Sequence, residues 1–83
     1  MMPSIEGTIS REGKPLGGAY VRLIGPSGEF TAERYTQDDG GFTFHVVDGV
    51  WKLEARAAGA QTATKEIEVK GDNAAVHVDL EPA

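Results

Sequence analysis

The sequence predicts an all-β fold, an antiparallel sandwich of seven short strands, on three observations. Apolar residues recur at every second position in short runs, turn-forming residues separate the runs at roughly 8 to 12-residue intervals, and no long 3.6-residue repeat occurs. The alanine-rich residues 54–64 are the rival for a helix. Gly59 in their middle disfavours a helix, and the alternation of Trp51, Leu53 and Ala55 favours a strand. We expect residues 1–83 to form one domain.

The first half of the chain predicts two regular strands and a less regular third. Residues 5–9 carry Ile at both ends of an alternating run, and residues 19–24 alternate again after a Gly- and Pro-rich turn. Residues 29–36 are β-prone without keeping one apolar face, so we expect a bulge or an edge position there. The second strand has an inner and an outer face, formed by Ala19, Val21 and Leu23 and by Tyr20, Arg22 and Ile24.

Residues 37–57 hold the only Trp and two of the three Phe. They predict a hairpin, with strands at residues 42–46 and 51–57 joined by a short Asp-Gly loop. Large apolar side chains stand at every second position, so the hairpin has one buried face, and the other segments have to supply a second layer. That face comprises Phe42, Phe44, Val46, Trp51, Leu53, Ala55 and Ala57.

The last two predicted strands span residues 62–69 and 74–81, with a tight turn at residues 71–73. Their inward positions are apolar, and His77 and Asp79 fall on the outward side of the final strand. The inward residues are Ile67, Val69, Ala74, Val76, Val78 and Leu80.

Composition excludes several function classes. The chain has no Cys, so it can form neither a disulfide nor a thiolate zinc site. Thirteen acidic residues stand against eight basic ones, a net charge of -5, and the basic residues are scattered singly. We therefore expect no nucleic acid and no membrane as partner, because both need clustered Lys and Arg. Residues 1–6 lack a basic or an apolar signal segment, and we expect a cytoplasmic protein.

Three segments resemble the carboxypeptidase regulatory-like domains of transthyretin (prealbumin) type, and together they cover nearly the whole chain. They are residues 7–23 (GTISREGKPLGGAYVRL), 36–44 (TQDDGGFTF) and 49–59 (GVWKLEARAAG). The resemblance implies a prealbumin-like, seven-stranded Greek-key sandwich with no established activity. Hydroxyisourate hydrolases of this fold carry an N-terminal His, an Arg and a C-terminal Tyr-Arg-Gly-Ser-type segment. This chain ends in residues 78–83 (VDLEPA), which do not match that C-terminal segment.

A narrower resemblance rests on residues 17–23, 29–33 and 49–53, which are similar to a small stand-alone bacterial family of unknown function. Members of that family are often encoded beside rhodanese-type thiosulfate sulfurtransferases. The resemblance therefore implies a thiosulfate sulfurtransferase as partner, by association alone.

The residue types for nucleophilic catalysis are few. Ser4, Ser10 and Ser27 are the candidate nucleophiles, with His45 or His77 as the base. No Gly-x-Ser-x-Gly elbow is present, and the Gly-Pro-Ser-Gly context of Ser27 favours a turn. We expect no enzyme, and no cofactor.

Metal binding has equally weak support in the sequence. His45 and His77 with Asp79 or Asp48 are residue types that bind divalent metals, but the two His meet only if their strands are neighbours. Residues 38–40 resemble a fragment of a calcium loop that lacks its other ligands, so we expect a turn.

The remaining candidate site is a protein-binding surface at Tyr20, Arg22 and Ile24, extended by Tyr35 and Phe30 if their strands are adjacent. An aromatic, an Arg and an aliphatic side chain together are typical of an interface hot spot. The same face is also compatible with cover by a loop or with plain exposure. The sequence thus favours a non-catalytic protein-interaction or accessory module, and the alternative is a small-ligand or carbohydrate-binding module using Trp51.

Overall fold

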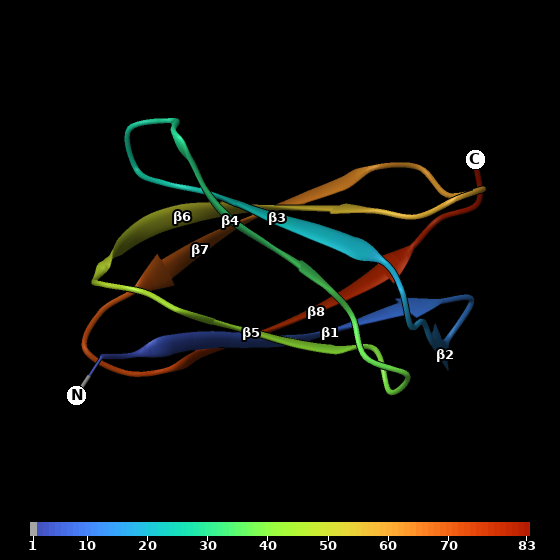
Figure 1. The fold of residues 1–83 in the computed structure, drawn as a ribbon, viewed down its shortest axis with the longest axis horizontal. Coiled ribbons are helices and arrows are strands. Elements are labelled where there is room, and N and C mark those ends of the chain that lie inside the picture. The colour runs from blue at the N-terminus through green and yellow to red at the C-terminus, as the bar shows by residue number, and fades with distance from the viewer. Residues whose placement is uncertain (1) are drawn as a thin grey trace.

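A computed structural model of the chain describes residues 2–83 and consists of strands, turns and loops (Figure 1). The prediction of an all-β sandwich is confirmed. No helix long and apolar enough to span a membrane occurs among these residues. The strands are β1 (Ser4–Arg11), β2 (Lys14–Pro15), β3 (Tyr20–Ile24), β4 (Phe30–Tyr35), β5 (Gly41–His45), β6 (Gly49–Arg56), β7 (Ala63–Val69) and β8 (Ala74–Leu80).

The strands form two packed sheets. In the first, sheet A, β1 pairs with β8 along one edge and with β5 and the two-residue β2 along the other. In the second, sheet B, the order is β4-β3-β6-β7. Every strand pair of residues 2–83 is antiparallel except β1 and β8, which run parallel and so depart from the expected purely antiparallel pattern.

The hairpin predicted for residues 42–57 is wrong. β5 pairs with β1 in sheet A, whereas β6 pairs with β3 and β7 in sheet B, so the link at residues 46–48 crosses between the sheets (Figure 1). Phe44 and Trp51 consequently face the core from opposite sheets. A hairpin within one sheet and two strands in opposite sheets each bury one face of every strand. The sequence therefore shows the same alternation of apolar residues in both cases. The turn before β8 likewise joins sheet B to sheet A.

The predicted inward faces are confirmed. The alternate positions of β3, β5 and β6 are buried, and together with those of β1, β7 and β8 they form one hydrophobic cluster between the sheets. Ala57, Ala74 and Val76 are only partly buried and pack against its margin. The buried apolar residues are Ile5, Ile9, Ala19, Val21, Leu23, Phe42, Phe44, Val46, Trp51, Leu53, Ala55, Ile67, Val69, Val78 and Leu80.

β4 is an edge strand with a bulge, as the sequence predicted for residues 29–36. It pairs with β3 on one side, and the register shifts between Leu23 and Ile24. The buried Thr36 ties its end to the start of β3, because the Thr36 hydroxyl donates to the Leu16 carbonyl at 2.6 Å and accepts from the Ala19 amide at 2.9 Å. This contact fixes how the outward side chains of β3 and β4 line up.

Candidate functional site

The structure brings the predicted protein-binding residues together on the outer face of sheet B. The register of β3 and β4 places Tyr20 opposite Tyr35 and Ile24 opposite Phe30. Tyr35 is 66% exposed and Phe30 51% exposed, whereas the outward residues of β3 are half-buried between their neighbours. We call this group the sheet B patch, and it consists of Tyr20, Arg22, Ile24, Phe30 and Tyr35.

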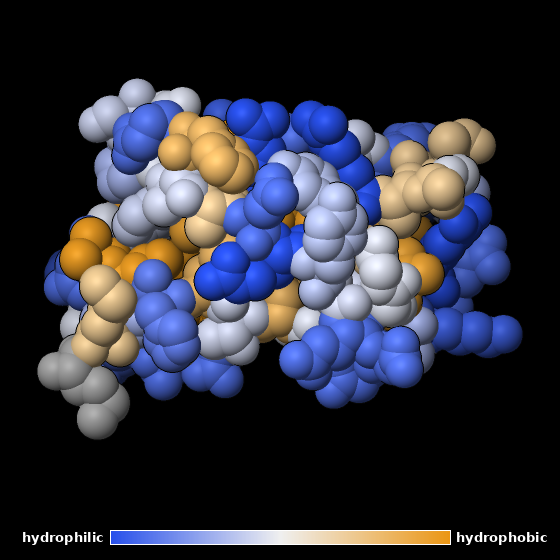
Figure 2. All heavy atoms as spheres, viewed as in Figure 1, coloured by the Kyte–Doolittle hydropathy of each residue, from blue (hydrophilic) through white to orange (hydrophobic). Residues whose placement is uncertain are grey.

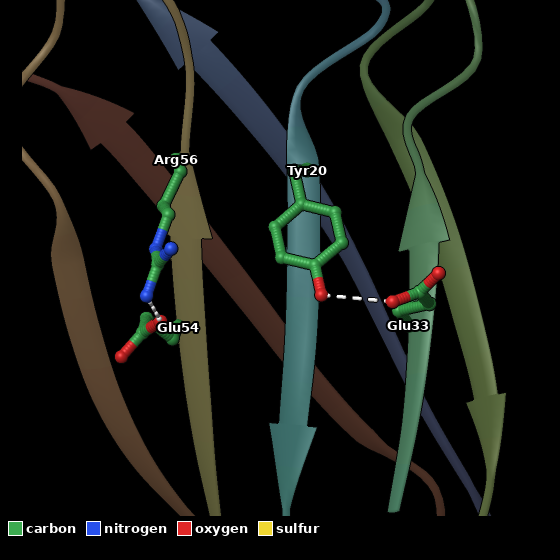
Figure 3. A network of polar contacts seen from close by, with 4 residues as sticks. All are labelled: Tyr20, Glu33, Glu54 and Arg56. Atoms are coloured by element: carbon green, nitrogen blue, oxygen red, sulfur yellow. Dashed lines mark hydrogen bonds and ion pairs between the residues drawn. The ribbon is translucent and has the colours of Figure 1, made fainter. Parts of the chain in front are cut away.

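Two contacts hold the aromatic rings of the sheet B patch in place. The ring centroids of Tyr20 and Tyr35 are 5.5 Å apart, with an interplanar angle of 54°. The Tyr20 hydroxyl donates to Oε1 of Glu33 at 2.8 Å (Figure 3). This hydrogen bond raises the pKa of Tyr20 above its ordinary value of 10.0. Partial desolvation of the hydroxyl and the negative charge of Glu33 act in the same direction. Tyr20 is therefore ordered before any partner arrives.

Arg22 lies at the centre of the sheet B patch between two carboxylates of neighbouring strands. Its register partners are Glu33 on β4 and Glu54 on β6, and its guanidinium carbon lies 5.1 Å from the centroid of the Phe30 ring. The buried Nε of Arg22 has no hydrogen-bond partner among residues 2–83. Glu54 is paired instead with Arg56, an exposed ion pair at the rim of the patch (Figure 3).

A polar cluster on the outer face of sheet A brings together Ser10, His77 and Asp79, which the sequence had offered only as separate candidates for catalysis or metal binding. The parallel register of β1 and β8 places Thr8 beside His77 and Ser10 beside Asp79. Ser10 Oγ donates to Asp79 Oδ1 at 2.6 Å and lies 3.1 Å from His77 Nε2, while Thr8 Oγ1 lies 2.7 Å from His77 Nδ1. The alternating pattern of residues 74–81 does place His77 and Asp79 on the outward side. It does not indicate that β1 is the neighbouring strand.

The proton arrangement in this cluster differs from that of a nucleophile with its base. The Ser10 hydroxyl hydrogen points to Asp79, so Nε2 of His77 has to donate in its contact with Ser10 Oγ. A general base would instead accept that hydrogen. The hydrogen bonds from Ser10 and then from the Gly13 amide hold the pKa of Asp79 below its ordinary value of 3.8, against the opposing effect of desolvation. The cluster joins β1, β8 and the turn before β2.

The two histidines are kept apart. His45 on β5 is aligned with Ser4 and His77 on β8 with Thr8, on opposite sides of β1. The condition for a shared His45–His77 site is therefore not met. Asp48 accepts a hydrogen bond from the Gly71 amide, and no group of three metal-ligating side chains occurs within the described residues 2–83.

Trp51 belongs to the core, as its parity predicted. It is 6% exposed, and its indole N–H donates to the Val47 carbonyl at 3.0 Å. The ring thus has neither free surface nor a free donor for a ligand. A carbohydrate site built on Trp51 is not supported.

Solved structures with the same fold include enzymes and a protein named only by family. The 5-hydroxyisourate hydrolase of Klebsiella pneumoniae aligns over 96% of this chain and 91% of its own, with a TM-score of 0.78 and 22% identity. Catechol 1,2-dioxygenase from Acinetobacter sp. ADP1 aligns over 98% of this chain and 52% of its own (TM-score 0.80, 14% identity). A DUF3823 family protein from Parabacteroides merdae aligns over 96% and 46% (TM-score 0.77, 16% identity). At these identities the likeness concerns the fold alone, and it confirms the prealbumin-like sandwich.

Sequence relatives occur in mycobacteria. An uncharacterized protein of Mycobacterium tuberculosis is 42% identical over 50 residues, which are 60% of this chain and 50% of the relative. One of Mycolicibacterium smegmatis is 40% identical over 47 residues, 57% of this chain and 52% of the relative. The chain thus matches about half the length of these curated relatives. A family model described as "Protein of unknown function (DUF1416)" matches residues 3–80, and the chain belongs to that family.

Proposed function

We propose that the chain is a non-catalytic interaction module and that the sheet B patch binds another protein. The observation that carries the proposal is the fixed pair of Tyr20 and Tyr35, which leaves 66% of Tyr35 exposed. Tyr and Arg are enriched among residues that dominate binding energy, and rings that are already ordered lose less entropy on binding. The exposed Phe30 ring, stacked with Arg22, extends the same surface.

The absence of catalysis is part of the proposal. Its support is chemical, because the Ser10 proton is donated to Asp79 and His45 lies across β1 from His77. The cytoplasmic location stays a prediction. Nucleic acid and membranes are left out as partners because the basic residues are scattered through the sequence.

The partner we propose is a thiosulfate sulfurtransferase of the same cell. Its support is the resemblance of residues 17–23, 29–33 and 49–53 to a family often encoded beside such enzymes. A patch of aromatic rings around an Arg suits the core of a protein interface. The Glu54–Arg56 ion pair would lie at the polar rim of that interface.

Calorimetric titration of the purified chain with that sulfurtransferase tests the proposal. The double variant Tyr20→Ala, Arg22→Ala is expected to bind at least about 30-fold more weakly, the loss of roughly 2 kcal/mol typical of hot-spot residues. The matched control Thr43→Ala, His45→Ala changes exposed residues of sheet A and should bind like the wild type. Equal unfolding midpoints exclude misfolding as the cause.

The two parts of the proposal fail separately. A wild-type chain that does not bind the sulfurtransferase contradicts the choice of partner. Binding that the Tyr20→Ala, Arg22→Ala variant retains in full contradicts the sheet B patch.

A further inference from the structure

β4 forms a free edge of sheet B. Among residues 2–83 it pairs with β3 alone, and all of its residues except Ala32 are exposed. Both exposed aromatic side chains of this part of the chain, Phe30 and Tyr35, belong to β4. Figure 2 shows the side of the molecule on which β4 lies in Figure 1, with hydrophobic surface between hydrophilic side chains. An unpaired strand edge that bears apolar side chains is a template for another strand.

The backbone groups of Glu33 and Tyr35 point to this free edge. The Thr36 amide donates to the Ala19 carbonyl, in the segment before β3, at 2.9 Å. Backbone groups alternate in direction along a strand, so Arg34, two residues earlier, also bonds toward β3. The amides and carbonyls of the residues on either side of Arg34 therefore point away from β3.

The free stretch of the edge is short. Beyond Tyr35 it is closed, because the Gln37 amide donates to the Gly41 carbonyl at 3.0 Å. At the other end the ladder becomes irregular, since the register with β4 shifts between Leu23 and Ile24. The edge therefore suits one short extended segment rather than a long strand.

The side chains beside the edge indicate which charges that segment carries. The Arg34 Nη1 donates to the edge-facing carbonyl of Glu33 at 2.7 Å, and its guanidinium carbon lies 5.1 Å from the centroid of the Phe44 ring, on the core side of β4. Arg34 is exposed, so an incoming backbone amide can replace this bond and leave the guanidinium to a carboxylate. On the outward side, the Glu33 carboxylate uses one oxygen for the Tyr20 hydroxyl and has a second for a cation.

Other pairings fit the edges of sheet B less well. The opposite edge strand, β7, exposes Lys65, Glu66 and Glu68 and has no aromatic residue. Charged side chains on an edge disfavour the addition of a strand. A second copy of β4 is also a poor partner, because antiparallel pairing about Glu33 or Arg34 sets like charges of the two copies opposite each other.

We propose that an extended segment of the protein partner adds to the free edge of β4 as an antiparallel strand. The segment carries an apolar residue beside Tyr35, a carboxylate beside Arg34 and a cation beside Glu33. The inference rests on the proposed function, since the added strand is the part of that partner that lies beside the sheet B patch.

Amide chemical-shift titration with the blocked hexapeptide acetyl-Thr-Val-Glu-Lys-Val-Thr-amide tests the strand pairing. We expect saturable shifts of Glu33, Arg34 and Tyr35 by about 10 mM peptide, ten times a Kd of about 1 mM. N-methylation of the first Val and of the Lys blocks the amides that bond to β4 and should abolish the shifts. N-methylation of the Glu and of the second Val, whose amides point away, should leave the shifts unchanged. The absence of saturable shifts, or equal shifts from the two methylated peptides, would overturn the proposal.

Two variants extend the test to the protein partner. Glu33→Pro and Glu33→Ala both remove the carboxylate, but only Pro removes the edge amide, and Pro is tolerated on edge strands. In calorimetric titration with the sulfurtransferase, Glu33→Pro is expected to bind at least about tenfold more weakly than Glu33→Ala, at equal unfolding midpoints.

The outcomes separate this inference from the proposed function. Equal affinity of the two Glu33 variants, with binding still lost in Tyr20→Ala, Arg22→Ala, would contradict the added strand and leave the sheet B patch in place. A wild-type chain that binds the hexapeptide but not the sulfurtransferase would support the added strand and contradict the choice of partner. Self-association of the wild type that Glu33→Pro abolishes would assign the edge to a second copy and overturn the proposal.

Discussion

Phe44 heads the fully buried side chains of residues 2–83 by volume, with 1% of its surface exposed. Its ring packs edge-on against Phe42, with centroids 5.8 Å apart, and Arg34 covers it from β4. Phe44 therefore joins the core to Arg34 on the edge strand β4. Without disulfides, such contacts have to supply most of the stability of this small domain.

Phe44→Ala is expected to lower the free energy of unfolding by about 3 to 5 kcal/mol, because it leaves a cavity in a packed core. That is a large part of the roughly 5 to 15 kcal/mol available to a single domain. Urea unfolding measures the effect. The control Phe30→Ala removes the same atoms from a half-exposed ring and should cost less than about 1 kcal/mol, mainly its cation–π contact with Arg22. Equal losses in the two variants would show that Phe44 is not a core residue.

Alternation predicts single residues well in this chain. Val21, Phe44 and Trp51 are buried where their parity places them, and Tyr35 and Phe30 lie beside the outward residues of β3. The period of two depends only on which face of a strand meets the core, and it needs no knowledge of the neighbouring strand.

The parallel pair β1 and β8 depends on a polar contact as well as on its backbone ladder. Ser10 donates to Asp79, and the Gly13 amide donates to the same oxygen, so one carboxylate joins both strands to the turn before β2. Its pKa is depressed in the folded chain, so its charged form stabilises the fold. That contribution is present above the ordinary pKa of 3.8 and is lost as the pH falls through the lower folded value.

Asp79→Asn is expected to shrink the loss of stability that the wild type shows between about pH 6 and about pH 2.5, because the variant has no charge to lose. Ser10→Ala removes the largest cause of the depressed pKa and should act in the same direction. The urea midpoint at each pH is the measurement. A pH dependence in Asp79→Asn that matches the wild type would show that Asp79 does not carry this linkage.

Pairing between strands could be predicted only in part. The edge position and the bulge of β4 followed from the irregular parity of residues 29–36. The hairpin of residues 42–57 did not form, since strands that face each other across a core show the same alternation as strands that pair. Ser10, His77 and Asp79 were each named as candidates, but their meeting in one cluster could not be predicted. It depends on β8 lying beside β1, and no local sequence pattern indicates that pairing.

The whole sandwich presents two different outer faces. Sheet B carries the aromatic and Arg-centred patch, and sheet A exposes small and polar side chains such as those of Thr43, Ala75 and His77. The patch extends onto β4, the edge strand that Thr36 ties to β3. The two outer faces thus differ in chemistry on a domain whose Cα radius of gyration is 12.1 Å.

Site-specific photocrosslinking in the cells that make the protein tests the role of the sheet B patch most directly. We place p-benzoyl-phenylalanine at position 35 in one variant and at position 45, an exposed residue of sheet A, in another. The proposed function predicts a discrete adduct of higher mass from position 35 and none from position 45. No adduct from position 35, or the same adduct from both positions, would contradict the assignment of this face as the protein-binding surface.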